Sequence, residues 1–218
     1  MYLVSKRLFD IVCSFLGLII LSPLLIPIMI ILKLTGEHEV FYFQKRVGFK
    51  NKDFFIWKFA TMVKNSPNFG TGEITLRNDP RVTPFGKFLR MSKINELPQI
   101  INVLKGNMSL VGPRPLVKKS FDLYPEEVKA IVYDSKPGIT GIGSVIFRDE
   151  EKILSESKDM RQAYWQIFQY KGKVESWYHQ HRSFLTDMLI LFLTAWYVPF
   201  PQSKLVYRVF PGLPKRDF

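Results

Sequence analysis

The side chains best suited to chemistry include a carboxylate directly after an amide, Glu96 following Asn95. A phosphate-handling enzyme would more naturally place two carboxylates there. Both residues also have a structural explanation, because the apolar pattern predicts a helix that begins near Asn95 and ends at Gly106. Asn is a favoured N-cap residue, and the helix dipole favours a negative charge such as Glu96 in the first turn. Residue types alone therefore leave a structural and a functional role open for this pair.

Four cations accompany the pair, beside prolines or at the edges of predicted helices. They are Lys58, Lys87, Arg90 and Arg114. Arginine binds phosphate through two parallel hydrogen bonds, so the set favours a phosphorylated ligand over the alternative of solvated surface charges. Arg114 is the strongest candidate, because Pro113 and Pro115 restrict the backbone on both sides of it.

Other site chemistries find little support in the sequence. The three histidines, His38, His179 and His181, lack the spacing of a zinc site. Neither a Walker loop nor a dinucleotide-binding glycine pattern is present, and the glycine-rich stretch 138–143 lacks the strand-then-helix setting. Cys13 is the single cysteine, so no disulfide can form within the chain, which fits a reducing compartment.

The charge balance and one apolar run together favour a membrane protein. The 218 residues carry 31 Lys and Arg against 19 Asp and Glu, a net charge of +12, which favours anionic partners such as nucleic acid, lipid headgroups or phosphorylated substrates. Residues 11–32 contain no charged side chain. As a helix they would extend about 33 Å, enough to cross a hydrocarbon core. A nucleic-acid-binding protein would leave this run unexplained.

Two features of the run favour a helix that enters the membrane, bends and returns, over a plain spanning anchor. Ser22 and Pro23 lie at its midpoint and Pro27 follows one turn later, and proline kinks a helix. Basic residues lie on both sides of the run, whereas a spanning helix usually has them on one side. The sequence therefore predicts a re-entrant membrane region, residues 1–36, followed by a domain of residues 37–218.

The remaining sequence predicts a mainly helical α+β domain. Two aromatic, β-prone stretches separated by residues 50–52 predict a small hairpin. The predicted strands are 41–49 and 53–62, the predicted helices are 84–91, 95–106, 125–132 and 150–171, the predicted loops are 63–83 and 136–147, and 109–117 is an extended turn. The apolar tail 183–201 is short for a second span, so it predicts an amphipathic helix in the membrane interface or a helix buried on the domain.

Several long motifs resemble those of the bacterial monotopic phosphoglycosyl transferases, also called bacterial sugar transferases. The match runs through nearly the whole chain. The most specific motifs are NDPRVTPFGKFLR (78–90), NELPQIINVLKGNMSLVGPRP (95–115) and KPGITG (136–141), and they are accompanied by KRLFD (6–10), FQKRVG (43–48), WKFATM (57–62) and the Ser22-Pro23 break.

The resemblance implies a membrane helix bent at Ser22-Pro23 and a catalytic domain on the cytoplasmic face of the bacterial inner membrane. The implied reaction moves a sugar 1-phosphate from a UDP-sugar to a polyprenyl phosphate such as undecaprenyl phosphate. Its products are UMP and a polyprenyl-diphosphate sugar, the first membrane intermediate of exopolysaccharide, capsule or O-antigen synthesis. Mg²⁺ is the implied cofactor, with Glu96 as a ligand. No nucleic acid is involved, and a homodimer is an open alternative for the oligomeric state. The residues expected to bind phosphate or substrate are Lys58, Lys87, Arg90, Pro113 and Arg114.

The sequence departs from the family pattern at the catalytic pair. In the family's Asp-Glu dyad the Asp is the nucleophile that forms a covalent phosphosugar intermediate, and Asn95 stands in its place. A neutral amide is a poor nucleophile. Three routes stay open. Glu96 is itself the nucleophile with Asn95 donating a hydrogen bond, or the lipid phosphate attacks the sugar diphosphate directly, or the chain binds substrates as a scaffold without turnover. The remaining motifs keep most of the residues expected of the site, which favours an active enzyme.

Two smaller departures lie in the other motifs. Ala60 stands where many relatives have arginine, and Gly143-Ser144 replaces a frequent Trp-Gln. Both changes are expected to reshape contacts to the sugar or the nucleotide.

Overall fold

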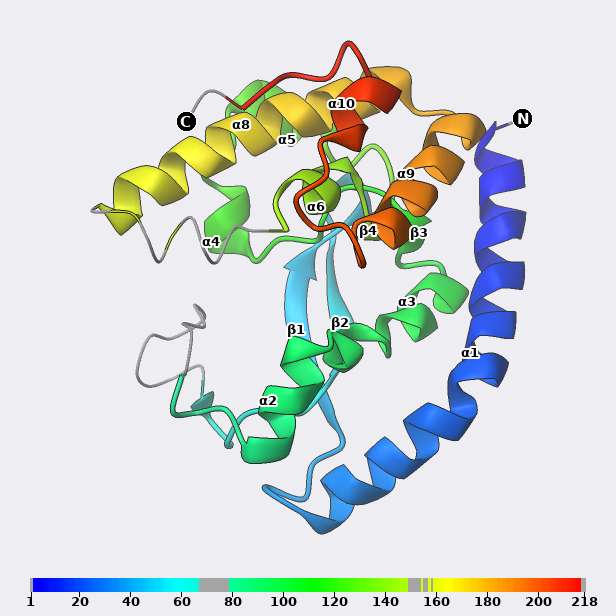
Figure 1. Ribbon diagram of the computed structural model, residues 1–218, viewed down its shortest axis with the longest axis vertical. Coiled ribbons are helices and arrows are strands. Elements are labelled where there is room, and N and C mark those ends of the chain that lie inside the picture. Colours follow the sequence, from blue (N-terminus) through cyan, green and yellow to red (C-terminus); the bar gives the residue numbers. More distant parts are fainter. Residues whose placement is uncertain (1, 67–78, 149–153, 155–156, 158, 217–218) are drawn as a thin grey trace.

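The N-terminal helix curves around one side of the domain. The computed structural model describes residues 2–66, 79–148, 154, 157 and 159–216. Its first helix, α1, spans Tyr2–Leu34 and contains Pro23 and Pro27. Figure 1 shows that α1 bends partway along and continues beneath the domain. By length and composition α1 could cross a membrane, and many of its apolar side chains are exposed.

The local hydrogen bonds explain how the helix continues through Pro23. Proline has no N–H, so the carbonyl of Ile19 loses its usual donor four residues later. The hydroxyl of Ser22 donates to that carbonyl at 2.7 Å. The hydroxyl of Ser22 therefore satisfies the carbonyl that Pro23 leaves without its usual donor.

The predicted hairpin is confirmed. Strands β1 (Phe41–Val47) and β2 (Asp53–Phe59) pair antiparallel, and a short 3-10 turn, η1 (Phe49–Asn51), connects them. The register pairs Tyr42 with Lys58 and Arg46 with Phe54. Because side chains alternate along a strand, Arg46 and Lys58 lie on the same face of the hairpin, which occupies the centre of the molecule in Figure 1.

The predicted helix 84–91 is confirmed, whereas the helix predicted for 95–106 begins later than expected. Helix α2 spans Pro84–Met91, whereas the chain near Asn95 forms a 3-10 turn, η3 (Ile94–Glu96), and α3 begins only at Gln99 (Gln99–Lys105). Leu97 and Pro98 both keep right-handed helical dihedral angles, but Pro98 has no N–H to continue the helical hydrogen bonds, so it separates the two elements. Gly106 ends α3 with φ 87°, as predicted. Most of the predicted loop 63–83, residues 67–78, lies outside the described residues.

The predicted loop 136–147 is wrong, since it contains a strand and a helix. Strand β4 (Gly138–Thr140) pairs parallel with β3 (Ser109–Val111), and α6 (Ile142–Ile146) follows. This pairing is non-local, so no local periodicity indicated it. The two backbones approach closely, because a Cβ on Gly138 would lie 2.1 Å from the nitrogen of Gly112.

The remaining helices build two apolar clusters, and one of these helices, α9 (Phe184–Trp196), packs against β3 and β4. Helix α5 (Glu126–Ile131) confirms the prediction for 125–132, and α4 (Lys118–Phe121) precedes it. Helix α8 (Met160–His181) extends beyond the predicted end at 171, while most of residues 149–158 lie outside the described residues. Helices α9 (Phe184–Trp196) and α10 (Leu205–Val209) pack with α6 and α8 around the side chains of Ile167, Ile190 and Leu193.

A buried ion pair joins α1 to the domain. The ammonium group of Lys6 pairs with Asp187 Oδ2 and also donates to the carbonyl of Val111 at 2.8 Å. Asp187 Oδ1 accepts from the hydroxyl of Tyr178 at 2.7 Å, and Oδ2 accepts from Tyr2 at 2.9 Å. The carboxylate of Asp187 is thus fully hydrogen-bonded, as a buried charge requires.

A second set of hydrogen bonds extends this attachment by one turn of α1. Asp10 Oδ1 accepts from the backbone N–H of Leu110 at 3.0 Å. The guanidinium of Arg7 donates to the carbonyls of Val103 and Leu104 at 2.6 and 2.9 Å, at the C-terminal end of α3. Polar side chains on the first half of α1 therefore fix β3 and α3.

We expect Asp187→Asn to lower the free energy of unfolding by about 3–5 kcal/mol, because it leaves the charge of Lys6 buried without a counter-charge. The measurement is thermal or denaturant unfolding of the protein in detergent. The matched control is Asp122→Asn in the exposed Lys118–Asp122 pair, which should cost less than about 1 kcal/mol. Equal losses of unfolding free energy in the two variants would show that the buried pair stabilises the fold no more than an exposed pair does.

Candidate active site

Glu96 lies between two cations that come from different elements. Its Oε1 accepts from the ammonium group of Lys58 at 2.9 Å, and Nη2 of Arg114 lies 3.5 Å from the same oxygen. Lys58 belongs to β2, Glu96 to η3, and Arg114 to the loop after β3. The structure therefore brings together three site residues that the sequence predicted.

These residues line a small depression together with a cation that the sequence analysis had not assigned to the site. The lining residues are Arg46, Ile56, Lys58, Glu96, Gln99, Arg114, Pro115, Gly138 and Ile139. Arg46 was noticeable only as part of the FQKRVG motif, and its alternation with Lys58 on the hairpin face is the signal that could have identified it. Three cations and one carboxylate leave a surplus of two positive charges, which suits a diphosphate.

The surrounding charges fix the ionisation of Glu96 and Lys58. Burial alone would raise the pKa of Glu96, but the positive charges of Lys58 and Arg114 and the hydrogen bond from Lys58 outweigh it, and they hold this pKa well below its usual range. Burial, with Arg46 and Arg114, lowers the pKa of Lys58 to about 8, although Glu96 opposes the shift. The carboxylate is therefore ionised at neutral pH and needs no base to become a nucleophile.

Asn95 does not serve as the N-cap that its residue type suggested. It lies inside η3 rather than at the start of α3. Its side chain is buried, and within the described chain its Oδ1 has no hydrogen-bond partner. The carboxylate of Glu96, by contrast, faces the depression. A buried oxygen without a partner is unusual, and it lies one residue from the proposed metal ligand.

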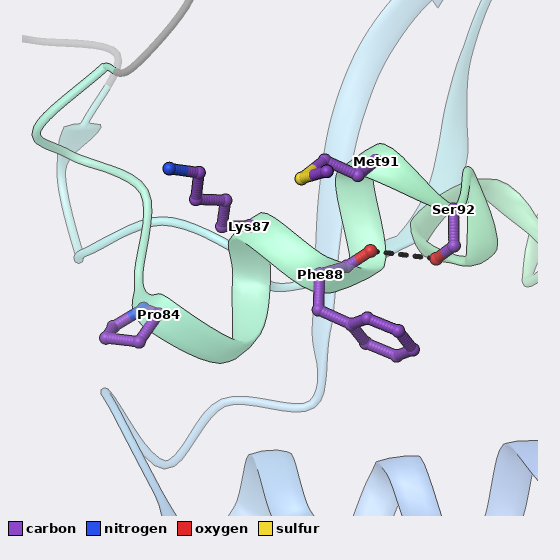
Figure 2. A pocket seen from close by; sticks show the side chains of 5 residues that line it. All are labelled: Pro84, Lys87, Phe88, Met91 and Ser92. Carbon is purple, nitrogen blue, oxygen red and sulfur yellow. Dashed lines mark hydrogen bonds between the residues drawn. The ribbon is translucent and has the colours of Figure 1, made fainter.

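Two further predicted residues lie on α2. Arg90 donates to the hydroxyl of Thr61 at 3.2 Å. Lys87 lines a second, shallow pocket with Pro84, Phe88, Met91 and Ser92, shown in Figure 2. Neither residue is among those lining the Glu96 depression, so their role in substrate binding stays a prediction.

The donor set at Glu96 fits Mg²⁺ only when a phosphorylated ligand is bound with it. In the described part of the chain, no group of three or more His, Cys, Asp or Glu side chains could hold a metal. Mg²⁺ prefers oxygen and often uses one or two protein ligands, with phosphates and water completing its coordination. The carboxylate of Glu96 and the unsatisfied Oδ1 of Asn95 are oxygen donors of that kind.

Comparison with known proteins identifies a family that matches most of the chain. The sequence profile described as "Bacterial sugar transferase" matches residues 1–200. The chain is 37% identical over 204 residues to "Undecaprenyl-phosphate galactose phosphotransferase" of Salmonella typhimurium, covering 87% of this chain and 39% of the relative. It is 34% identical over 195 residues to "UDP-N-acetylgalactosamine-undecaprenyl-phosphate N-acetylgalactosaminephosphotransferase" of Aeromonas hydrophila, covering 88% and 43%.

The chain matches a shorter relative over most of its length. It is 32% identical over 205 residues to "Exopolysaccharide production protein ExoY" of Sinorhizobium fredii, with coverage of 88% of this chain and 84% of that protein. By contrast, it spans about two fifths of the Salmonella and Aeromonas relatives.

We expect the affinity for a UDP-sugar to fall as the pH rises through about 8, because Lys58 then loses its charge. A bound diphosphate favours the charged form, so the fall should be centred at or above that value. Calorimetric titrations from pH 6.5 to 10, without divalent cations, would measure it. Lys58→Arg keeps its charge over this range and should show no such fall. A decline of equal size in both proteins would assign the titration to another group.

Proposed function

Because the chain belongs to the bacterial sugar transferase family, we propose that it transfers a sugar 1-phosphate from a UDP-sugar to undecaprenyl phosphate and releases UMP. The observation that carries the proposal is the ionised carboxylate of Glu96 held between Lys58 and Arg114. The names of the relatives specify galactose and N-acetylgalactosamine as transferred sugars. The diphosphate is common to all such donors, and it is the part that the cationic depression fits.

In this mechanism the three cations bind the diphosphate and Glu96 performs the displacement. Arg46, Lys58 and Arg114 neutralise the phosphate oxygens, which supplies much of the barrier lowering in phosphoryl transfer. Glu96 attacks the phosphorus that carries the sugar. A new bond between a Glu96 carboxylate oxygen and phosphorus forms, giving an acyl phosphate (a mixed anhydride), while the bond from phosphorus to the bridging oxygen breaks and UMP leaves with that oxygen. Bound Mg²⁺, held by Glu96 and Asn95, would add further neutralisation of the diphosphate.

The second half of the reaction returns Glu96 to its starting state. A phosphate oxygen of undecaprenyl phosphate attacks the same phosphorus, a diphosphate bond forms, and the carboxylate leaves. A carboxylate with a low pKa leaves readily, so the ion pairs with Lys58 and Arg114 favour this step. The burial of Asn95 and the exposure of Glu96 to the depression support Glu96 as the nucleophile among the three routes.

The scaffold alternative rests on a specific observation, the amide of Asn95 where the family has a carboxylate. In that case the cationic depression would bind the UDP-sugar without turnover. The two functions differ in whether UMP is released.

We also propose that α1 enters and leaves the membrane on one side, the cytoplasmic face. The first half of α1 contacts α3, β3 and α9. In the second half, Leu25, Ile28 and Leu32 pack with Phe59 and Leu89 of the same domain. A straight spanning helix would hold its ends a bilayer apart. Contacts of both halves with one domain therefore support a re-entrant path, which brings the site next to a lipid phosphate and a soluble nucleotide sugar.

We expect Glu96→Gln to lower UMP release at least about 10³-fold, because the amide can neither attack phosphorus nor leave. The assay uses a panel of UDP-sugars with undecaprenyl phosphate and Mg²⁺. Asn95→Asp is the matched variant and should be at least as active as the starting protein. Release seen only in Asn95→Asp would establish the scaffold alternative, and full activity of Glu96→Gln would refute the assigned role.

Covalent and direct routes can be separated without the lipid. If Glu96 is the nucleophile, the protein incubated with a UDP-sugar alone should release up to one equivalent of UMP and gain the mass of a phosphosugar on the peptide containing Glu96. Direct attack by the lipid phosphate would give neither product until undecaprenyl phosphate is added.

We expect Ser22→Ala/Pro23→Ala to straighten α1 and move one flank across the bilayer, because the helix regains the hydrogen bond that proline removed. Cysteines at Val4 and Glu37, in a Cys13→Ser background, would be labelled with an impermeant reagent in inverted and intact vesicles. With Ser22 and Pro23 retained, both cysteines should react from the same side. Labelling from opposite sides in that protein would rule out the re-entrant path.

A further inference from the structure

Other parts of the structure hold the loop that carries Arg114. Pro113 and Pro115 have no N–H, so this loop has few donors of its own. The hydroxyl of Tyr133 donates to the carbonyl of Arg114 at 2.9 Å and accepts from the N–H of Leu116 at 3.0 Å. One hydroxyl therefore connects the two residues that flank Pro115.

The remaining carbonyls of the loop are also bonded to neighbouring elements. The carbonyl of Pro113 accepts from the N–H of Gly138 at 2.9 Å, and that of Leu116 accepts from Val47 at 2.9 Å. The guanidinium of Arg46 donates to the carbonyl of Pro115 at 3.2 Å. The backbone on both sides of Arg114 is thus fixed, and at Arg114 itself the fixing group is the Tyr133 hydroxyl.

The ring of Tyr133 is held firmly enough for its hydroxyl to act as a fixed point. Tyr133 is 1% exposed and packs with Val47, Leu116 and Val128. Its ring stacks on Phe121, with centroids 5.6 Å apart and planes 20° apart. Burial raises the pKa of Tyr133 far above neutral, so the hydroxyl keeps the proton that it donates to Arg114.

We propose that Tyr133 is a positioning residue that aims the guanidinium of Arg114 at the anion bound beside Glu96. The proposal rests on the proposed function in taking that anion to be a diphosphate. The guanidinium is 47% exposed on its side chain and lies 3.5 Å from Glu96, and its position relative to Glu96 depends on where the backbone of Arg114 is held. Bidentate hydrogen bonding of arginine to phosphate depends on the orientation of the guanidinium group. A small displacement of the loop therefore lowers the affinity for the anion.

Removing the hydroxyl should loosen the loop without unfolding the domain. In Tyr133→Phe the buried N–H of Leu116 and the carbonyl of Arg114 lose their partner, while the ring and its packing remain. Hydrogen exchange of the segment containing Leu116 should become faster. Tyr164→Phe is the matched control, because its hydroxyl contacts Ser120 rather than the loop, and it should leave this exchange unchanged. Unchanged exchange in Tyr133→Phe would overturn the proposal.

The decisive measurement is a double-mutant cycle on the binding of inorganic pyrophosphate to the full chain in detergent. Tyr133→Phe should weaken binding about fivefold, the equivalent of one lost hydrogen bond, and Tyr164→Phe less than twofold. In an Arg114→Ala background Tyr133→Phe should have almost no further effect, because its action passes through Arg114. Independent, additive losses would show a merely structural role and overturn the proposal.

The outcomes separate this proposal from the proposed function. Absence of UMP release across the donor panel would defeat the proposed function, while the exchange and pyrophosphate measurements would still decide the role of Tyr133. If UMP is released but the losses of pyrophosphate affinity in the double-mutant cycle are additive, the proposed function is supported and the positioning role of Tyr133 is refuted. Failure of the starting protein to bind pyrophosphate would overturn the positioning role directly, since Arg114 would then have no anion to meet.

Discussion

The buried pair of Lys6 and Asp187 is the interaction on which the arrangement of the molecule depends. Burying two charges is costly unless every oxygen and proton finds a partner, and here the partners come from four elements: α1, β3, α8 and α9. Val111, which accepts from Lys6, lies three residues before Arg114 in the chain. The same polar cluster that attaches α1 therefore sets the starting point of the loop that reaches Glu96.

The site uses charge rather than a preformed metal cage. Glu96 is stabilised as an anion by Lys58 and Arg114, and with Arg46 these cations leave the depression with a positive surplus. A phosphorylated ligand bound in such a site would relieve part of its like-charge repulsion. The unusually low pKa of Lys58 reflects that repulsion together with burial. Positioning of the cations is then the main task of the fold, and the hairpin, η3 and the 113–116 loop each supply one part.

Sequence reasoning predicted the elements whose signals are local. Pro84 marked the start of α2, and the stretches around residues 50–52 marked the hairpin. It missed β4, because the residue that pairs with Gly138 of β4 is Ser109 of β3, 29 positions earlier in the chain. It placed Glu96 and Arg114 in one site only through the family motifs. Arg46 could be assigned only by adding the strand register to the predicted hairpin, and Tyr133 required knowledge of which backbone groups its hydroxyl contacts.

The amide at position 95 alters the charge balance that the rest of the site provides. With Asn95 the three cations face one carboxylate, a surplus of two, whereas an Asp there would leave a surplus of one. The present chain should therefore hold a diphosphate more strongly and Mg²⁺ less strongly, since a metal would lose one anionic ligand. In the proposed reaction, electrostatic binding of the donor and metal-assisted activation would thus be shifted in opposite directions by one side chain. The fold accommodates this because Asn95 is buried inside η3, while Arg46, Lys58 and Arg114 are supported by other elements.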